Sequence, residues 1–278
     1  MPPARRACVT LLSDDSYLPG TIALGESLRR RDWPHATVVL VTGDVSPRVR
    51  DALHPWWDEV EEVELLPPAS SDGLWLEQFA TVYTKLHVWR LERFEKVLYV
   101  DSDAIAVGPL EEALERSRFA AAPCVTTPDT FNTGVLVLEP DEAVFRDMRS
   151  RLEGWLDDVG FADQAFLNAY FPDWYEGPAE HRLPFTYNVN HALYHVPPAW
   201  ERLRDDWRVL HFPGPRKPWS LPWGWPVRAL HAVLARRGWR ADGPSPMALW
   251  WEVWNDALRH APDAARVAGL RKSRGWSF

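Results

Sequence analysis

The 278-residue sequence predicts an α/β fold in which one largely parallel, doubly wound sheet is flanked by helices. Strand-like and helix-like stretches alternate through the first 220 residues, at a spacing typical of βα units. Apolar residues make up 46% of the chain, enough for a sizeable buried core. A single domain of this type accommodates a chain of this length.

The first elements follow from apolar periodicity and from capping residues. Leu24 and Leu28 stand four residues apart, which places them on one face of a helix. Ser46 and Pro47 form a typical helix start, with a serine cap and a proline at the first position. We therefore expect, in order, a strand at Ala7–Leu12, a helix from about Pro19 to Arg31, a strand at Ala36–Val41, a helix after Pro47, a strand at Val60–Leu66 and a loop from Pro67 to Gly73.

The following elements continue the alternation of short apolar runs with helical stretches. The run Lys96–Val100 (KVLYV) is of the buried-strand type. The other expected elements are a helix from about Thr81 to Phe94, strands at Phe119–Val125 and Asn132–Leu138, helices near Asp141–Leu156 and Asp163–Phe171, and a strand at Arg208–Phe212. In such sheets ligands bind beyond the carboxyl ends of the strands, where the strand order reverses. Asp101, Asp103, His211 and the turn at 13–16 all come just after predicted strands.

The last 60 residues form a separate element, because eight of the 17 tryptophans lie between Trp219 and Trp276. We divide the chain into a domain at 1–220 and a helical extension at 221–278 that packs on it. Within Ser245–His260 an apolar stripe recurs at helical spacing, formed by Met247, Trp250, Trp251, Trp254 and Leu258. Basic residues at 236–240 and 271–274 are interpreted as a solvated face, with contact to an anionic membrane surface as the alternative. Exposed tryptophan is also compatible with a homodimer interface.

Composition excludes several classes of protein. The net charge of -8 argues against a nucleic-acid-binding surface, which needs a basic stripe. No apolar run approaches the roughly 20 residues that span a bilayer, and no secretory apolar segment follows Met1. We therefore expect a soluble, cytoplasmic protein without a transmembrane segment. Cys8 and Cys124 both stand in apolar runs and are expected to be buried thiols rather than a disulfide.

Asp101-Ser102-Asp103 is the first candidate for chemistry. Two carboxylates one residue apart after a strand can hold a hard divalent cation through their oxygens. Such an ion would bridge the diphosphate of a nucleotide donor. The alternatives are a solvated turn, where Asp is common, and the nucleophile pair of phosphatases that form an aspartyl-phosphate. The phosphatase pair usually ends the first strand, whereas at least three strands are expected before Asp101.

The segment from His211 to Trp219 is the second candidate. A neutral imidazole at His211 can complete a metal site, Gly214 lets the backbone approach a phosphate, and Lys217 supplies a positive charge. A histidine at the end of an apolar strand is also compatible with a core residue whose polar atoms are satisfied.

These stretches carry a resemblance to the family 8 retaining glycosyltransferases, the group that includes glycogenin and the plant galactinol synthases. Seven motifs keep the family's order from residue 8 to 219: Val9-Thr10-Leu11 with Tyr17, Tyr83–Trp89 (YTKLHVW), Tyr99–Asp103 (YVDSD), Phe131–Val135 (FNTGV), Asp163-Gln164 with Leu167-Asn168, Leu183–Asn188 (LPFTYN), and His211-Phe212 through Gly214 to Trp219. The run Trp250–Asp256 also resembles a C-terminal segment of galactinol synthases.

The resemblance implies a GT-A type fold, with a single Rossmann-like mixed sheet flanked by helices, a UDP-sugar donor and a Mn²⁺ or Mg²⁺ ion. Asp101, Asp103 and His211 would ligate the metal, with Ser102 between the carboxylates where the family often has Ala. Gly214 and Lys217 would hold the diphosphate. Leu11, Ser13, Asp14 and Tyr17 would face uracil and ribose, and Lys85, Asn132, Asp163 and Gln164 would hold the transferred sugar. An arginine that glycogenin carries before its lysine helix has no clear counterpart at 74–76.

The implied reaction is the retaining transfer of a hexose, from UDP-glucose first and UDP-galactose second, to an acceptor hydroxyl on a small polyol, a natural product, a glycan or a protein. Asp163, Lys217 and Asp103 are the candidate catalytic residues. Asp163 is also a candidate helix N-cap. Tyr194 lies near the place of the tyrosine that glycogenin glucosylates in itself, but a core tyrosine is the preferred interpretation. The alternative function is a catalytically inactive nucleotide-sugar-binding protein.

Overall fold

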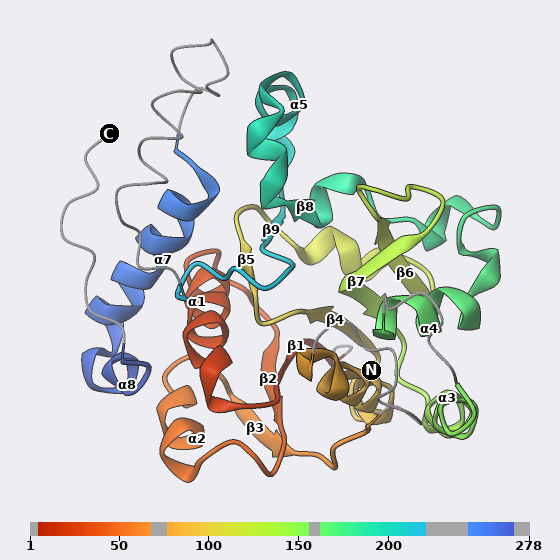
Figure 1. Cartoon of the computed structure of the whole chain (residues 1–278), viewed down its shortest axis with the longest axis horizontal. Helices are drawn as coiled ribbons and strands as arrows, with labels where there is room; N and C mark the ends of the chain where they lie inside the picture. Colours follow the sequence, from red (N-terminus) through yellow and green to blue (C-terminus); the bar gives the residue numbers. More distant parts are fainter. Residues whose placement is uncertain (1–4, 68–76, 156–161, 221–243, 270–278) are drawn as a thin grey trace.

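The computed structural model describes residues 5–67, 77–155, 162–220 and 244–269, and its centre is a six-stranded sheet (Figure 1). The strand order is β3-β2-β1-β4-β7-β6. These strands are β1 (Arg6–Leu12), β2 (Ala36–Val41), β3 (Glu59–Glu62), β4 (Lys96–Val100), β6 (Phe119–Pro123) and β7 (Phe131–Leu138). Strand order reverses between β1 and β4, which places the switch point of the sheet there.

The sheet is mixed, as the family resemblance implies; the largely parallel arrangement predicted from the alternation of strands and helices holds for β1 to β4 and not for β6 and β7. Strand β1 pairs in parallel with β2 and β4, and β2 in parallel with β3, whereas β7 runs antiparallel to both β4 and β6. Strand β7 follows β6 after a loop of seven residues, 124–130, a connection that suits an antiparallel pair. The beginning of β7 therefore lies at the same edge as the carboxyl end of β4.

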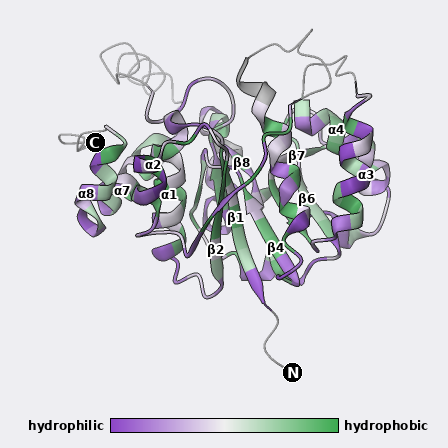
Figure 2. Cartoon of the chain, turned by 90° about the horizontal axis from the view of Figure 1, so that it is seen from below, coloured by the Kyte–Doolittle hydropathy of each residue, from purple (hydrophilic) through white to green (hydrophobic). Residues whose placement is uncertain are grey.

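Two apolar cores fill the two faces of the sheet, and β1 contributes to both. Cys8 and Leu12 belong to one core, and Val9 and Leu11 to the other, as expected for alternating side chains in a strand buried on both faces. Figure 2 shows α1, α2, α7 and α8 on one side of the sheet and α3 and α4 on the other. The helices of the main domain are α1 (Leu18–Arg29), α2 (Pro47–Leu53), α3 (Glu142–Leu152), α4 (Ala162–Tyr170) and α5 (Pro197–Leu203).

A small second sheet lies beyond the carboxyl end of β4. It has three strands in the order β5 (Ala104–Ala106), β9 (Val209–His211) and β8 (Val189–Asn190). The expected strand at Arg208–Phe212 belongs to this sheet and not to the main one. Antiparallel pairing sets His211 opposite Ala104, the residue directly after Asp103. The second sheet thereby brings the two sequence candidates for metal binding together.

Two expected elements differ from the structure. The segment expected to be a helix at Thr81–Phe94 forms a 3₁₀ helix, η2 (Glu77–Arg90), and a turn closed by the Phe94 N–H on the Leu91 carbonyl follows it. The strand expected to reach Leu66 ends at Glu62, and the Leu66 N–H is bound by the Thr84 hydroxyl of η2 instead. The other 3₁₀ helices are η1 (Asp15–Tyr17), η3 (Glu111–Glu115), η4 (Pro172–Trp174), η5 (Ala179–His181), η6 (Phe185–Tyr187), η7 (His191–His195) and η8 (Arg204–Asp206).

The C-terminal helices α7 (Pro246–His260) and α8 (Pro262–Val267) pack on α1 and α2 respectively. Trp250 and Trp254 of the predicted apolar stripe are buried, whereas its other members are half-buried. Arg30 of the segment after α1 pairs with Glu252 at 2.6 Å and with Asp256 at 3.3 Å. The basic residues at 236–240 and 271–274, and most of the predicted loop at 67–73, lie outside the described residues. Within the described ranges, no helix is long and apolar enough to cross a membrane.

Candidate active site

A cavity of about 370 Å³ opens at the edge of the sheet where β1 and β4 end and β7 begins. Its volume is that of a small-molecule site. Every site residue expected from the sequence, apart from Asp14, lines it: Leu11, Ser13, Tyr17, Lys85, Asp101, Ser102, Asp103, Asn132, Asp163, Gln164, His211, Gly214 and Lys217.

Asp101, Asp103 and His211 form a cluster in which one ligand atom from each lies within 4.8 Å of the others. His211 Nε2 lies 3.1 Å from Asp103 Oδ1 and 4.0 Å from Asp101 Oδ2. The backbone fixes these positions, because the Asp101 N–H donates to Gly134 O at 2.8 Å and the Phe212 N–H to Asp103 O at 3.0 Å. Two carboxylates suit Mg²⁺ or Mn²⁺, and the imidazole adds a ligand that transition ions accept. The donor set therefore fits the divalent cation that the sequence implies.

Lys217 binds the Asp103 carboxylate through the oxygen that His211 does not contact. Its ammonium pairs with Asp103 Oδ2 and donates to Phe212 O at 3.1 Å. Burial by itself would raise the pKa of Asp103, but the charges and hydrogen bonds of His211 and Lys217 hold it well below its usual range. Gly214, three residues before Lys217, has φ of +88°, a conformation that favours glycine.

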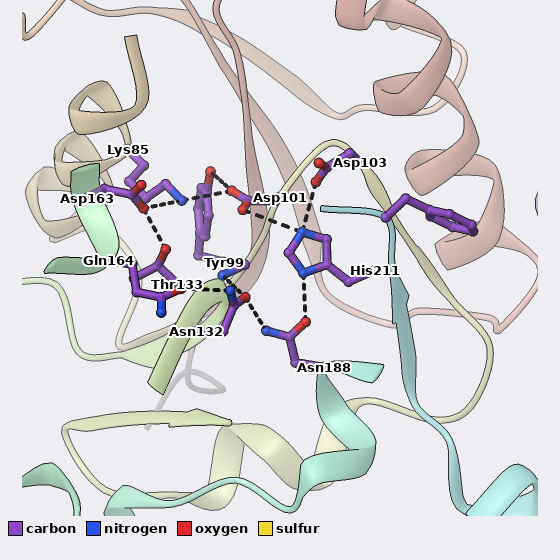
Figure 3. A network of polar contacts seen from close by, with 12 residues as sticks. Lys85, Tyr99, Asp101, Asp103, Asn132, Thr133, Asp163, Gln164, Asn188 and His211 are labelled. Carbon is purple, nitrogen blue, oxygen red and sulfur yellow. Dashed lines mark hydrogen bonds and ion pairs between the residues drawn. The ribbon is translucent and has the colours of Figure 1, made fainter. Parts of the chain in front are cut away.

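Lys85 bridges two carboxylates in the interior (Figure 3). Its Nζ lies 3.0 Å from Asp101 Oδ1 and 2.8 Å from Asp163 Oδ2, and the residue is only 3% exposed. Burial would lower the pKa of Lys85, but the two carboxylates outweigh it and raise the pKa above its usual value. The Tyr99 hydroxyl donates to Asp101 Oδ1 at 2.7 Å and the Thr133 hydroxyl to Asp163 Oδ2 at 2.6 Å.

The alternative role of Asp163 as a helix cap does not match its position. Helix α4 begins at Ala162, which has φ of +48°, so Asp163 stands in the first helical turn. Its carboxylate is engaged with Lys85 and Thr133 at the cavity. Tyr99 and Thr133 had no predicted role. The period of two along β4 places Tyr99 on the same side of the chain as Asp101, a signal that the sequence does contain.

Three amide side chains, of Gln164, Asn132 and Asn188, form a separate network that ends at His211 of the metal cluster (Figure 3). Asn132 Nδ2 donates to Gln164 Oε1 at 2.8 Å, and Asn188 Nδ2 donates to Asn132 Oδ1 at 2.7 Å. Asn188 Oδ1 lies 2.8 Å from His211 Nδ1. Asn188 stands in one of the motifs quoted above, but no local pattern indicates its contact with a residue 23 positions later.

The opposite wall carries the residues expected to face uracil and ribose. The Ser13 hydroxyl accepts from the Thr81 hydroxyl at 3.2 Å, and the Trp219 indole N–H donates to Ser16 O at 2.9 Å. The Trp219 ring meets Tyr17 edge-on, with 5.6 Å between the ring centroids. Asp14 does not line the cavity; its carboxylate accepts the Ser16 N–H at 2.8 Å and caps η1.

The two cysteines differ, although both were expected to be buried. Cys8 is fully buried in β1. Cys124 follows the end of β6, is half-buried and lines the cavity beside Val125 and Thr126. Tyr194, expected to be a core tyrosine, is only half-buried in η7, where it packs edge-on against Trp200 with ring centroids 5.2 Å apart.

Comparison with known proteins agrees with this architecture. The sequence pattern of Glycosyl transferase family 8 matches residues 111–221. Glycogenin-2 of Homo sapiens is 31% identical over 97% of this chain, which spans 54% of that protein. Glycogenin-1 of Oryctolagus cuniculus is 29% identical over 91% of the chain and 76% of its own length. Inositol phosphorylceramide glucuronosyltransferase 1 of Arabidopsis thaliana is 33% identical over 83% of the chain and 46% of its own length.

Solved structures agree in fold. The glycosyltransferase GlyE of Streptococcus pneumoniae superposes with a TM-score of 0.60 at 20% identity, over 96% of this chain and 62% of its own. The galactosyltransferase LgtC, solved as an active-site mutant, gives a TM-score of 0.60 at 19% identity, over 91% of this chain and all of its own. The mixed sheet with flanking helices is the GT-A type fold of these enzymes. The chain belongs to Glycosyl transferase family 8.

Proposed function

We propose that this protein transfers a hexosyl residue from a UDP-sugar to an acceptor hydroxyl, with retention at the anomeric carbon and with a divalent cation as cofactor. The observation that carries the proposal is the composition of the cavity. The cavity holds the cation donor set of Asp101, Asp103 and His211, and directly beside it the buried Lys85, which pairs with both Asp101 and Asp163. Retention and the UDP nucleotide are supported by family membership.

The nucleotide would lie between the end of β1 and the loop after β9. Leu11 and Ser13 line this part of the cavity, and Tyr17 offers an aromatic face to the base. Lys217 would hold the diphosphate, since its ammonium already lies beside Asp103 at the cavity wall. A bound Mn²⁺ or Mg²⁺ would offset the negative charge that develops on the departing diphosphate.

The transferred sugar would lie beside α4 and the start of β7. Asp163 can accept a hydrogen bond from a sugar hydroxyl, while Asn132 and Gln164 offer both donors and acceptors. Lys85 and Thr133 both bind Oδ2 of Asp163, which would keep the carboxylate in place before the donor binds. Asp163 is the carboxylate that we propose for a direct role at the reacting sugar.

UDP-glucose is the proposed donor and UDP-galactose the second choice. UDP-glucuronate belongs in the test panel, because one relative is named a glucuronosyltransferase. The acceptor is a hydroxyl of a small polyol, a natural product, a glycan or a protein. It would enter past Cys124, Val125 and Thr126, which line the cavity after β6.

The test is a donor screen with purified protein, Mn²⁺ and a panel of UDP-sugars, with released UDP as the readout. Asp103→Ala is compared with Asp263→Ala, which removes an exposed carboxylate of α8 that pairs on the surface with Arg266. We expect release from one donor, loss of that release in Asp103→Ala and no change in Asp263→Ala. If no donor is cleaved, a calorimetric titration with UDP decides between the alternatives. UDP binding without turnover on any acceptor indicates an inactive nucleotide-sugar-binding protein, and no UDP binding refutes the proposal.

A further inference from the structure

A backbone N–H determines which atoms donate and which accept in the hydrogen-bond network of Asn132 and Asn188. The Gly134 N–H can only donate, and it lies 3.0 Å from Asn132 Oδ1. This contact settles which end of the Asn132 amide is oxygen. The same oxygen is 2.7 Å from the Asn188 side chain, which must therefore present its NH₂ group there. It follows that the oxygen of Asn188 faces His211.

His211 Nδ1 lies 2.8 Å from this oxygen, so Nδ1 must carry a proton and donate it. A neutral ring then has its lone pair on Nε2, whereas in the absence of a cation Nε2 can also carry a proton and donate it to Asp103 Oδ1. Nε2 is the atom that faces Asp103 and Asp101, at 3.1 and 4.0 Å. The opposite tautomer would point an N–H at the place where the cation is expected and would lose the bond to Asn188.

We infer that Asn188 is a positioning residue that holds His211 in the Nδ1–H tautomer and so prepares Nε2 as a cation ligand. This inference rests on the proposed function, because it assigns Asn188 a role at the same site. Hydrogen bonds to the second nitrogen of a ligating histidine typically change metal affinity or activity about 10- to 100-fold.

The surroundings leave Asn188 and His211 little freedom. Asn188 is 5% and His211 4% exposed, and pairing of β8 with β9 holds the two segments side by side. Gly134 closes the other side of the ring: a Cβ at this position would lie 2.4 Å from His211 Cε1 and 2.7 Å from Nδ1. The network also continues through Asn132 to Gln164, so Asn188 connects the cation ligand to the residues proposed to hold the sugar.

Two substitutions test the role of Asn188. Asn188→Ala removes the acceptor for the Nδ1 proton, whereas Asn188→Asp keeps an acceptor but loses the NH₂ group that binds Asn132. The matched control is Asn255→Ala, which removes a half-buried amide from α7. The tautomer of His211 is read from its ¹⁵N chemical shifts in the metal-free protein, with the signals assigned by comparison with His211→Gln. Mn²⁺ affinity is measured separately by calorimetry.

We expect Nδ1 to carry its proton in the wild type and in Asn188→Asp, and to lose it in part of the Asn188→Ala molecules, in which the ring can keep a proton on Nε2 alone. Mn²⁺ affinity should fall about 10- to 100-fold in Asn188→Ala and recover most of its value in Asn188→Asp. Wild-type tautomer and affinity in Asn188→Ala would overturn the inference. The tautomer is measured without metal or donor, so a wild type that binds neither Mn²⁺ nor UDP would refute the proposed function while the tautomer result still decides the role of Asn188.

Discussion

Lys85 remains charged in the interior because two carboxylates meet it there. Its ammonium lies 3.0 Å from Asp101 and 2.8 Å from Asp163. Removing one partner of a buried ion pair leaves an uncompensated charge, which costs far more than the loss of a surface pair. The side chain therefore supports the stability of the site as well as the placement of Asp163.

Replacing Lys85 by Met should lower the free energy of unfolding by about 3–5 kcal/mol, because Asp101 and Asp163 then face each other without a counter-charge. The comparison is Arg266→Met, which removes an exposed pair with Asp263 and should cost less than about 1 kcal/mol. Urea unfolding followed by circular dichroism measures both values. Equal effects in the two variants would show that Lys85 contributes no more than a surface residue.

Cys124 is expected to be the reactive thiol of the described chain. Burial would raise its pKa, but hydrogen bonds with Thr126 and Thr127 outweigh burial and lower the pKa from 9.0 to about 7. Burial raises the pKa of Cys8. A lowered pKa means more thiolate at neutral pH, and the thiolate is the nucleophile.

Alkylation of native protein by iodoacetamide should therefore follow the ionisation of Cys124, with a rate that rises with pH and a midpoint at about 7. Mass spectrometry should find the label on Cys124 and none on Cys8, and Cys124→Ser should abolish labelling of the folded protein. A midpoint near the ordinary value of 9.0 would contradict the environment described for Cys124.

Among the elements, helix α1 approaches the loop that carries Asp101, Ser102 and Asp103 so closely that only glycine fits at position 20 of the helix. A Cβ at Gly20 would lie 2.2 Å from the backbone oxygen of Ser102 and 2.5 Å from the Trp219 ring. Gly20 therefore allows the first turn of α1 to contact both loops that carry proposed ligand-binding residues. A Cβ at Gly43, in contrast, would have its nearest neighbour, Glu62 Oε1, at 3.9 Å, an ordinary contact.

Gly20→Ala should force α1 away from Ser102, weaken UDP and Mn²⁺ binding by at least about 10-fold and destabilise the fold by about 1–3 kcal/mol. Gly43→Ala should leave binding unchanged and should leave stability unchanged or raise it by up to about 1 kcal/mol. Calorimetric UDP titration and thermal unfolding of the two variants provide the measurement. Wild-type binding in Gly20→Ala would contradict the close approach of α1 and the loop.

Some strands were predictable from the sequence alone, whereas their directions and tertiary contacts were not. The apolar runs at β1, β2 and β4 predicted those strands to within one residue, because a strand buried on both faces needs continuous apolar side chains. The direction of β7 could not be inferred from its own residues, since it depends on the connection from β6. The assignment of His211 to a second sheet and the contact of Asn188 with its ring are tertiary facts with no local signal.

At the scale of the whole molecule, the C-terminal helices share a core with the main sheet. Trp250 and Trp254 of α7 are fully buried and stack with ring centroids 5.8 Å apart, in the same apolar cluster as Leu18 and Ile22 of α1. Trp250 also contacts Trp219, at 5.6 Å between centroids, and Trp219 in turn contacts the Tyr17 ring. Packing of α7 is thereby connected to the wall of the cavity.

Trp250→Ala should lower the free energy of unfolding of the whole protein by about 3–5 kcal/mol, as expected for truncation of a large buried side chain. Trp251→Ala, at a half-buried neighbouring position, should cost less. Urea unfolding should move the main transition of the Trp250→Ala variant. A main transition that keeps its midpoint, with an earlier minor one, would show that α7 unfolds independently of the domain predicted at 1–220.

The antiparallel course of β7 has a consequence for how specificity can change in this architecture. The turn between β6 and β7, residues 124–130, emerges at the edge where the cavity lies, and Cys124, Val125 and Thr126 form part of its wall. A hairpin turn can change in length without altering the strands that it joins, because the hydrogen bonds that pair β6 with β7 lie outside the turn. If the proposed function holds, a change in the length or sequence of this turn would alter acceptor choice, while the proposed donor contacts on β1, β4, α4 and the loop after β9 would stay in place.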